Sequence, residues 1–90
     1  MIFYSIGGDE MVVREAVINR INEICDDRGM AVNKLANLSG ITPSTVYSVF
    51  DSDRKDIGIV LIKKICDGFD ITLEEFFSSE LFKTLEQELV

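Results

Sequence analysis

The segment SGITPSTVYS, at positions 39–48, constrains the fold of this chain more than any other. Gly40 tolerates the positive φ that lets a chain reverse direction within about three residues. Thr42 is a favourable helix N-cap, and Pro43 follows it at the first helical position, where a missing N–H costs nothing. The segment therefore predicts two short helices on either side of a tight turn made by Ser39-Gly40-Ile41.

Helical periodicity extends through most of the remaining chain. Apolar residues recur every three or four positions over about 13–28, 32–38 and 59–69. Thr72 and Glu75 have the spacing of a capping box, which predicts a further short helix. We expect the buried face of the segment 59–69 to consist of Ile59, Ile62, Ile65, Cys66 and Phe69.

The two ends of the chain differ in pattern. Residues 1–11 are either strand-like or disordered. In a third interpretation translation begins at Met11, because the codons for Gly7-Gly8-Asp9-Glu10 can form a ribosome-binding site just upstream of that start codon. Near the other end, leucines at four-residue spacing follow Ser79 and predict a helix over about 80–89. We expect one all-α domain: a tail at 1–11, a compact five-helix body at 12–78 and an additional C-terminal helix at 79–90 that packs on the core or on a partner.

Composition excludes several functional classes. The chain has no histidine, and its two cysteines, Cys25 and Cys66, lie in different helical segments. This excludes the usual zinc-site spacings and catalysis by histidine, so we expect no metal, no cofactor and no enzymatic activity. No apolar run approaches the roughly 18 residues that cross a bilayer, and no signal peptide is evident. We expect reduced, buried thiols and a cytoplasmic protein that does not contact membranes.

Charge is distributed unevenly along the chain, which has a formal net charge of −7. Residues 31–64 carry five basic and three acidic side chains, whereas the segments before and after them are net acidic. Binding to phosphates depends on local positive charge, and the global negative charge adds a long-range penalty. The predicted turn lies inside the only net-positive third of the sequence.

Two short helices joined by a turn that contains glycine form the helix-turn-helix arrangement. Six motifs occur in order between residues 21 and 77: I-x-x-I at 21–24, R-G-M at 28–30, K-L-A at 34–36, S-G-I-T-x-S-T-V at 39–46, I-K-K-I-C-D-G at 62–68 and I-T-L-E-E-F-F at 71–77. In these motifs the chain resembles the lambda-repressor-like (Cro/cI, XRE-type) helix-turn-helix family. The resemblance implies a five-helix domain that binds operator DNA as a dimer and regulates transcription.

The resemblance also implies roles for individual residues, because the start of the third helix enters the major groove in this family. The implied base-contacting residues are Thr42, Pro43, Ser44, Tyr47 and Ser48. The implied phosphate contacts are Lys34, Arg54 and Lys55. The chain departs from the family at Ala31-Val32, where Thr-Gln is common, and in the acidic residues Asp51, Asp53 and Asp56 beside the implied phosphate path.

The sequence therefore indicates a sequence-specific DNA-binding transcriptional regulator, in which a helix at about 42–51 occupies the major groove and a homodimer binds double-stranded DNA. The alternative is a protein-interaction module on the same fold, similar to an antitoxin or antirepressor, with little DNA binding. Two local questions also remain open. Lys63-Lys64 is expected on the solvated side of its helix, and Ile57, Val60 and Leu61 either complete the core or form an apolar patch for dimerisation.

Overall fold

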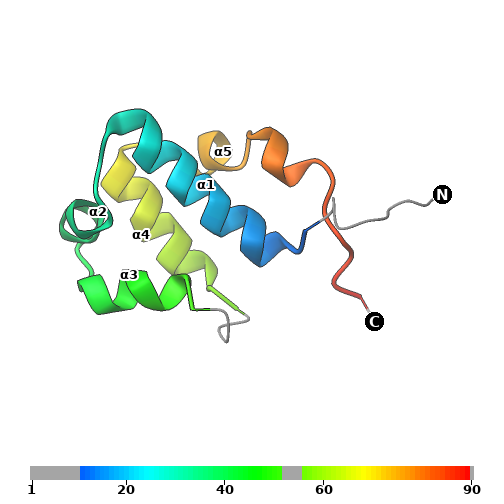
Figure 1. Ribbon diagram of the computed structural model, residues 1–90, viewed down its shortest axis with the longest axis horizontal. Helices are drawn as coiled ribbons and strands as arrows, with labels where there is room; N and C mark the ends of the chain where they lie inside the picture. The colour runs from blue at the N-terminus through cyan, green and yellow to red at the C-terminus, as the bar shows by residue number, and fades with distance from the viewer. Residues whose placement is uncertain (1–10, 52–55, 90) are drawn as a thin grey trace.

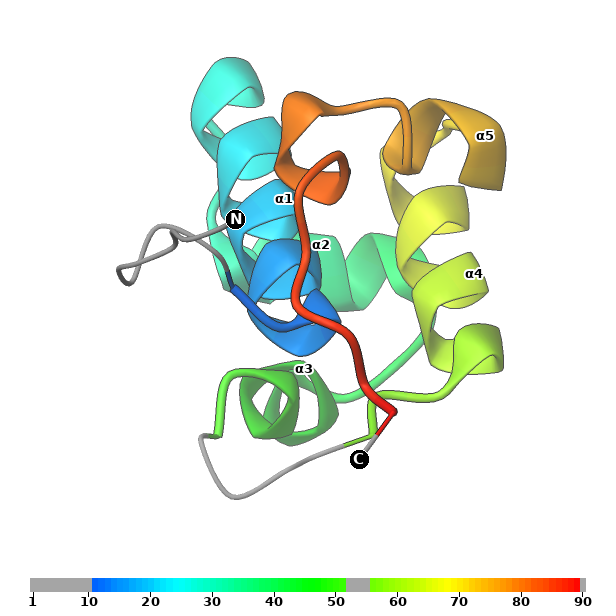
Figure 2. The ribbon, with the colours of Figure 1, turned by 90° about the vertical axis from the view of Figure 1, so that its right-hand side faces the viewer.

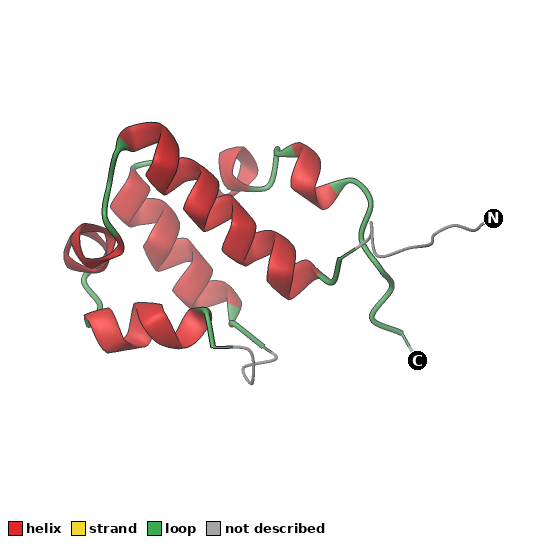
Figure 3. Ribbon diagram, in the orientation of Figure 1, coloured by secondary structure: helices red, strands yellow, loops and turns green. Residues whose placement is uncertain are grey.

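The computed structural model describes residues 11–51 and 56–89, and within these ranges the fold is all-helical (Figures 1 and 3). The elements are α1 (Val13–Arg28), α2 (Val32–Ser39), α3 (Pro43–Val49), α4 (Ile59–Phe69), α5 (Leu73–Phe76) and the 3₁₀ helix η2 (Glu80–Phe82). Within the described ranges, β pairing is limited to one parallel bridge between Met11 and Leu85. The predicted all-α, five-helix architecture is confirmed.

One hydrophobic core joins the helices. α2 packs against both α3 and α4, and α5 packs against α4. Every one of α1 to α5 contributes at least one side chain that is nearly or completely buried, among them Ile21, Leu35, Val49, Ile65, Phe69 and Phe76. The core therefore fixes the position of the helix-turn-helix segment relative to the rest of the domain.

Local signals place most helix ends where the sequence predicts them. Gly29 follows α1 with φ of 59°, and the N–H of Met30 donates to the carbonyl of Cys25 at 2.9 Å. The capping box at α5 is present in full: Thr72 Oγ1 accepts from the N–H of Glu75 at 3.0 Å, and Glu75 Oε1 accepts from the N–H of Thr72 at 3.0 Å. These ends are encoded within a few residues of sequence, which explains why the predictions are correct.

The predicted buried face of α4 needs one correction. Ile62, Ile65, Cys66 and Phe69 are buried as expected, but Ile59 is 60% exposed. α4 begins at Ile59, so this side chain belongs to a first turn at the edge of the core. Ile57, which precedes the helix, is buried in its place at 6% exposure.

The C-terminal segment differs from its prediction in extent. A helix does follow α5, and Ser79 Oγ caps it, but η2 ends at Phe82 rather than continuing to Leu89. The N–H of Glu86 donates to the carbonyl of Met11 at 3.0 Å, and this pairing draws the chain into an extended path near the start of α1 (Figures 1 and 2). The predicted helix over about 80–89 would have placed Leu81, Leu85 and Leu89 on one face, but it ends at Phe82 and Leu89 is 86% exposed, so this prediction is wrong.

Aromatic rings and an arginine attach η2 and α5 to the body. The ring of Phe82 lies 4.9 Å from that of Phe77 and 6.1 Å from that of Phe76, measured between centroids. Arg20 of α1 donates from Nε to the carbonyl of Phe76 at 2.7 Å and from Nη2 to that of Glu75 at 2.8 Å. Arg20 thus satisfies carbonyls at the end of α5, a role that local sequence could not reveal because the partners are 55 and 56 residues away.

Both cysteines are free and buried, and burial raises the pKa of each thiol above its ordinary value. Across residues 11–51 and 56–89, no three histidine, cysteine, aspartate or glutamate side chains converge as metal ligands would. The helices of the same ranges are too short or too polar for any of them to cross a membrane.

Candidate nucleic-acid interface

The turn between α2 and α3 is held by backbone hydrogen bonds and by the core. Gly40 adopts φ of 70°, the left-handed conformation for which glycine is suited. The N–H of Gly40 donates to the carbonyl of Asn37 at 3.3 Å, and that of Ile41 donates to the carbonyl of Ala36 at 3.1 Å. Leu35 and Ala36 are completely buried, so α2 anchors the turn on the domain.

The first turn of α3 carries a network of hydroxyl groups. Thr42 Oγ1 accepts from the N–H of Thr45 at 3.2 Å, which is the predicted N-cap, and Pro43 occupies the first turn as expected. The same oxygen lies 2.8 Å from Thr45 Oγ1 and 3.1 Å from Ser44 Oγ. The Thr42 hydroxyl is therefore engaged in holding the helix start, while Pro43 and Ser44 project beside it into solvent.

α3 has one buried and one exposed side. Val46 and Val49 are completely buried. Four of the five predicted base-contacting residues are exposed, namely Thr42, Pro43, Ser44 and Tyr47, and we call these four residues the α3 face. The fifth, Ser48, is half-buried, and its Oγ donates to the carbonyl of Thr45 at 2.7 Å.

Tyr47 is tied to the neighbouring helix by a side chain that the sequence did not single out. Its Oη donates to Oδ1 of Asn33, on α2, at 3.2 Å, and its side chain remains 52% exposed. Asn33 precedes Tyr47 by 14 residues, and neither residue type nor spacing marks the pair in the sequence. The bond becomes evident only once the turn brings the two helices together.

The predicted phosphate contacts divide into one that the structure describes and two that it does not. Lys34 is exposed in the first turn of α2, where Ala31 provides no side-chain cap. Arg54 and Lys55 lie outside the described residues. A further cation, Lys64 of α4, lines a shallow hollow together with Thr42, Thr45 and Asn37. Lys64 is exposed, as the sequence predicts. Its side chain lies next to the start of α3.

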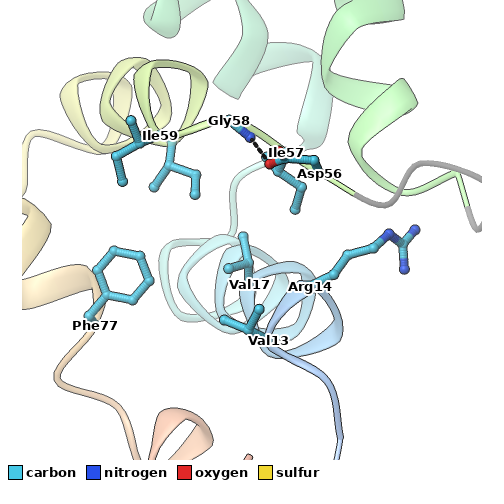
Figure 4. Close-up of a pocket in the computed structure, with 9 residues that line it drawn as sticks. Val13, Arg14, Val17, Asp56, Ile57, Gly58, Ile59 and Phe77 are labelled. Atoms are coloured by element: carbon cyan, nitrogen blue, oxygen red, sulfur yellow. Dashed lines mark hydrogen bonds between the residues drawn. The ribbon is translucent and has the colours of Figure 1, made fainter. Parts of the chain in front are cut away.

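A second hollow lies away from the α3 face, between the N-terminal turns of α1 and α4 (Figure 4). It has a volume of about 210 Å³ and an apolar lining that includes Val13, Val17, Ile59 and Phe77. The Arg14 side chain extends away from this hollow, and its guanidinium donates to the carbonyl of Asp51. Asp56 also lines the hollow, and its Oδ1 accepts from the N–H of Gly58 at 3.1 Å, so the lining is mostly apolar with one carboxylate at its edge.

Comparisons with known proteins agree with this helix-turn-helix arrangement. A family model described as a Cro/C1-type HTH DNA-binding domain matches residues 20–80, which include α2, the turn and α3. Among solved structures, the chain is similar to one described as the crystal structure of the prophage Lp1 protein 11. The two are 25% identical, with a TM-score of 0.73, over 83% of this chain and 99% of the other. No curated protein matches the sequence.

Proposed function

Since the chain belongs to the Cro/C1-type helix-turn-helix family of DNA-binding domains, we propose that it is a sequence-specific transcriptional regulator with α3 as its recognition helix. The observation that carries this proposal is the exposure of the α3 face opposite the buried Val46 and Val49. In helix-turn-helix proteins the second helix of the motif lies in the major groove and its N-terminal residues contact base edges. The same end of α3 is the exposed one here.

The chemistry of the α3 face favours modest discrimination between bases. Serine and threonine hydroxyls both donate and accept, so Thr42 and Ser44 are compatible with several base edges. The ring of Pro43 and that of Tyr47 supply apolar contacts for a thymine methyl group. Because the Ser48 hydroxyl donates to a backbone carbonyl, we assign it the smallest part in base readout.

Affinity in this proposal comes from groups around α3 rather than on it. Lys34 and the uncapped N-terminus of α2 are suited to a phosphate, because the first N–H groups of a helix and its dipole both favour an anion. Lys64, which lines the same hollow as Thr42, is a further candidate. Arg54 and Lys55, which the sequence suggested as phosphate contacts, complete the proposed set.

We further propose that two copies bind half-sites about one helical turn apart, and that the protein acts in the cytoplasm without catalysing a reaction. Exposed apolar side chains at the start of α4, Ile59 and Val60, support self-association, because apolar side chains gain from burial. Sedimentation of the protein alone and with DNA measures the stoichiometry, and a single copy on the selected site would contradict the dimer.

Selection from random double-stranded DNA tests the proposed function. The purified protein should enrich a defined sequence at low salt, and enrichment should weaken at higher salt because phosphate contacts release counterions. Absence of any enriched sequence at low salt would contradict the proposal.

A second function is favoured by one observation: none of the residues of the α3 face is lysine or arginine. A neutral face on a chain with a net charge of −7 is compatible with a protein-interaction module of the antitoxin or antirepressor kind. In that case the same selection would enrich nothing, which separates the two functions in one experiment.

A further inference from the structure

Asn33 and Tyr47 form a bridge between α2 and α3 at the surface that we propose for DNA. The phenol Oη of Tyr47 donates to Asn33 Oδ1 at 3.2 Å, and both residues are exposed. A hydrogen bond between exposed groups adds little to stability, because water would satisfy both partners in its absence. The bond therefore matters chiefly for what the two side chains present to an approaching molecule.

The bond determines which hydrogen-bonding groups face outward. A phenol has one O–H donor besides its lone pairs, and a primary amide has one carbonyl oxygen and two N–H donors. Because the proton of Tyr47 is directed at Asn33 Oδ1, Oη offers only lone pairs to a third group. Asn33 Nδ2 makes no hydrogen bond to the described residues, so both of its donors are available.

This pattern distinguishes two classes of base. In the major groove, adenine and cytosine present an amino group, whereas guanine and thymine present a keto oxygen. We propose that Asn33 is a positioning residue that keeps Tyr47 an acceptor, so that Tyr47 selects an amino-bearing base at one operator position. Asn33 Nδ2 then donates to a phosphate, since the first helix of the motif crosses the DNA backbone. This inference rests on the proposed function and specifies the base class that one residue reads.

Three variants separate the parts of this proposal. Tyr47→Phe removes only the hydroxyl, so the preference for adenine or cytosine at one position should fall about three- to tenfold, as for loss of one hydrogen bond. Asn33→Ala leaves the phenol in place but removes the acceptor of its hydrogen bond. The O–H of Tyr47 can then donate to a keto oxygen instead. The same position should therefore accept all four bases more equally.

Asn33→Asp tests positioning independently of phosphate contact. Its carboxylate still accepts the phenol proton, so the base preference should be retained. It also lacks the N–H donors and adds a negative charge, so affinity for every sequence should fall. Asn22→Ala is the matched control, because Asn22 is exposed on α1, outside the proposed surface, and its side chain makes no hydrogen bond within the described ranges. This variant should change neither the base preference at the affected position nor the DNA sequence that is selected.

Each variant is assayed by selection from random duplexes. A competition titration then compares four duplexes that differ only in the base at the affected position. If the wild-type protein selects a site but Tyr47→Phe and Asn33→Ala select the same base at every position, the inference is overturned while the proposed function stands. Relaxation by Asn33→Asp equal to that of Asn33→Ala also overturns it. If the wild-type protein enriches no sequence, the proposed function fails first.

Discussion

Gly68 shows how a single residue sets the distance between two helices. It lies inside α4, where glycine normally weakens a helix by about 1 kcal/mol relative to alanine. A Cβ at this position would lie 2.1 Å from Ser39 Oγ and 3.0 Å from the backbone nitrogen of Ser39. The glycine is therefore required by the close approach of α4 to the end of α2, next to the turn.

Replacing Gly68 with alanine should destabilise the protein despite the better helix propensity of alanine. We expect the free energy of unfolding to fall by about 1–3 kcal/mol, because the added methyl group forces the two backbones apart. Urea denaturation followed by circular dichroism measures the change. Asp67→Ala, at the adjacent exposed position, should cost less than about 1 kcal/mol through loss of its ion pair with Lys63. A Gly68→Ala variant as stable as the wild type would disprove the close approach.

At the scale of the element, sequence predicted what is encoded locally and missed what depends on distant partners. The caps at Thr42 and Thr72 act within one helical turn, and both were predicted correctly. The extended C-terminal segment depends on Met11, which is far away in sequence, and leucine spacing alone predicted a helix there. The bridge from Asn33 to Tyr47 was missed for the same reason.

The α5 capping box offers a test of how much one local signal contributes. Thr72→Ala removes the oxygen that accepts from the N–H of Glu75, and it should lower the free energy of unfolding by about 0.5–2 kcal/mol. Thr84→Ala is a suitable control, because Thr84 is an exposed threonine outside any helix. Equal stabilities of the two variants in urea denaturation would show that the capping box contributes nothing measurable.

At the scale of the whole molecule, a net charge of −7 must be reconciled with a DNA-binding family. The candidate cations lie in the middle third of the chain, where Lys34 is on α2 and Lys64, on α4, lines the same hollow as Thr42. Local charge can attract phosphates while the acidic remainder repels DNA at long range. We therefore expect weak non-specific binding and a strong dependence on ionic strength.

Salt dependence measures the contribution of Arg54 and Lys55, which sequence alone suggests as phosphate contacts. Replacing both with alanine should weaken binding to all sequences and reduce the slope of log affinity against log salt by up to about two. Fluorescence anisotropy on the selected duplex at several salt concentrations gives the slope. A double variant with an unchanged slope would remove both residues from the interface.

The central claim, that the α3 face is the DNA-binding surface, is tested most directly by mapping amide chemical shifts while a duplex is added to isotopically labelled protein. The account predicts that the largest shifts at low salt fall on residues 32–34, 42 and 44–48, with little change around the apolar hollow of Val13, Ile59 and Phe77. Shifts concentrated around that hollow, or no shifts at any position, would contradict it.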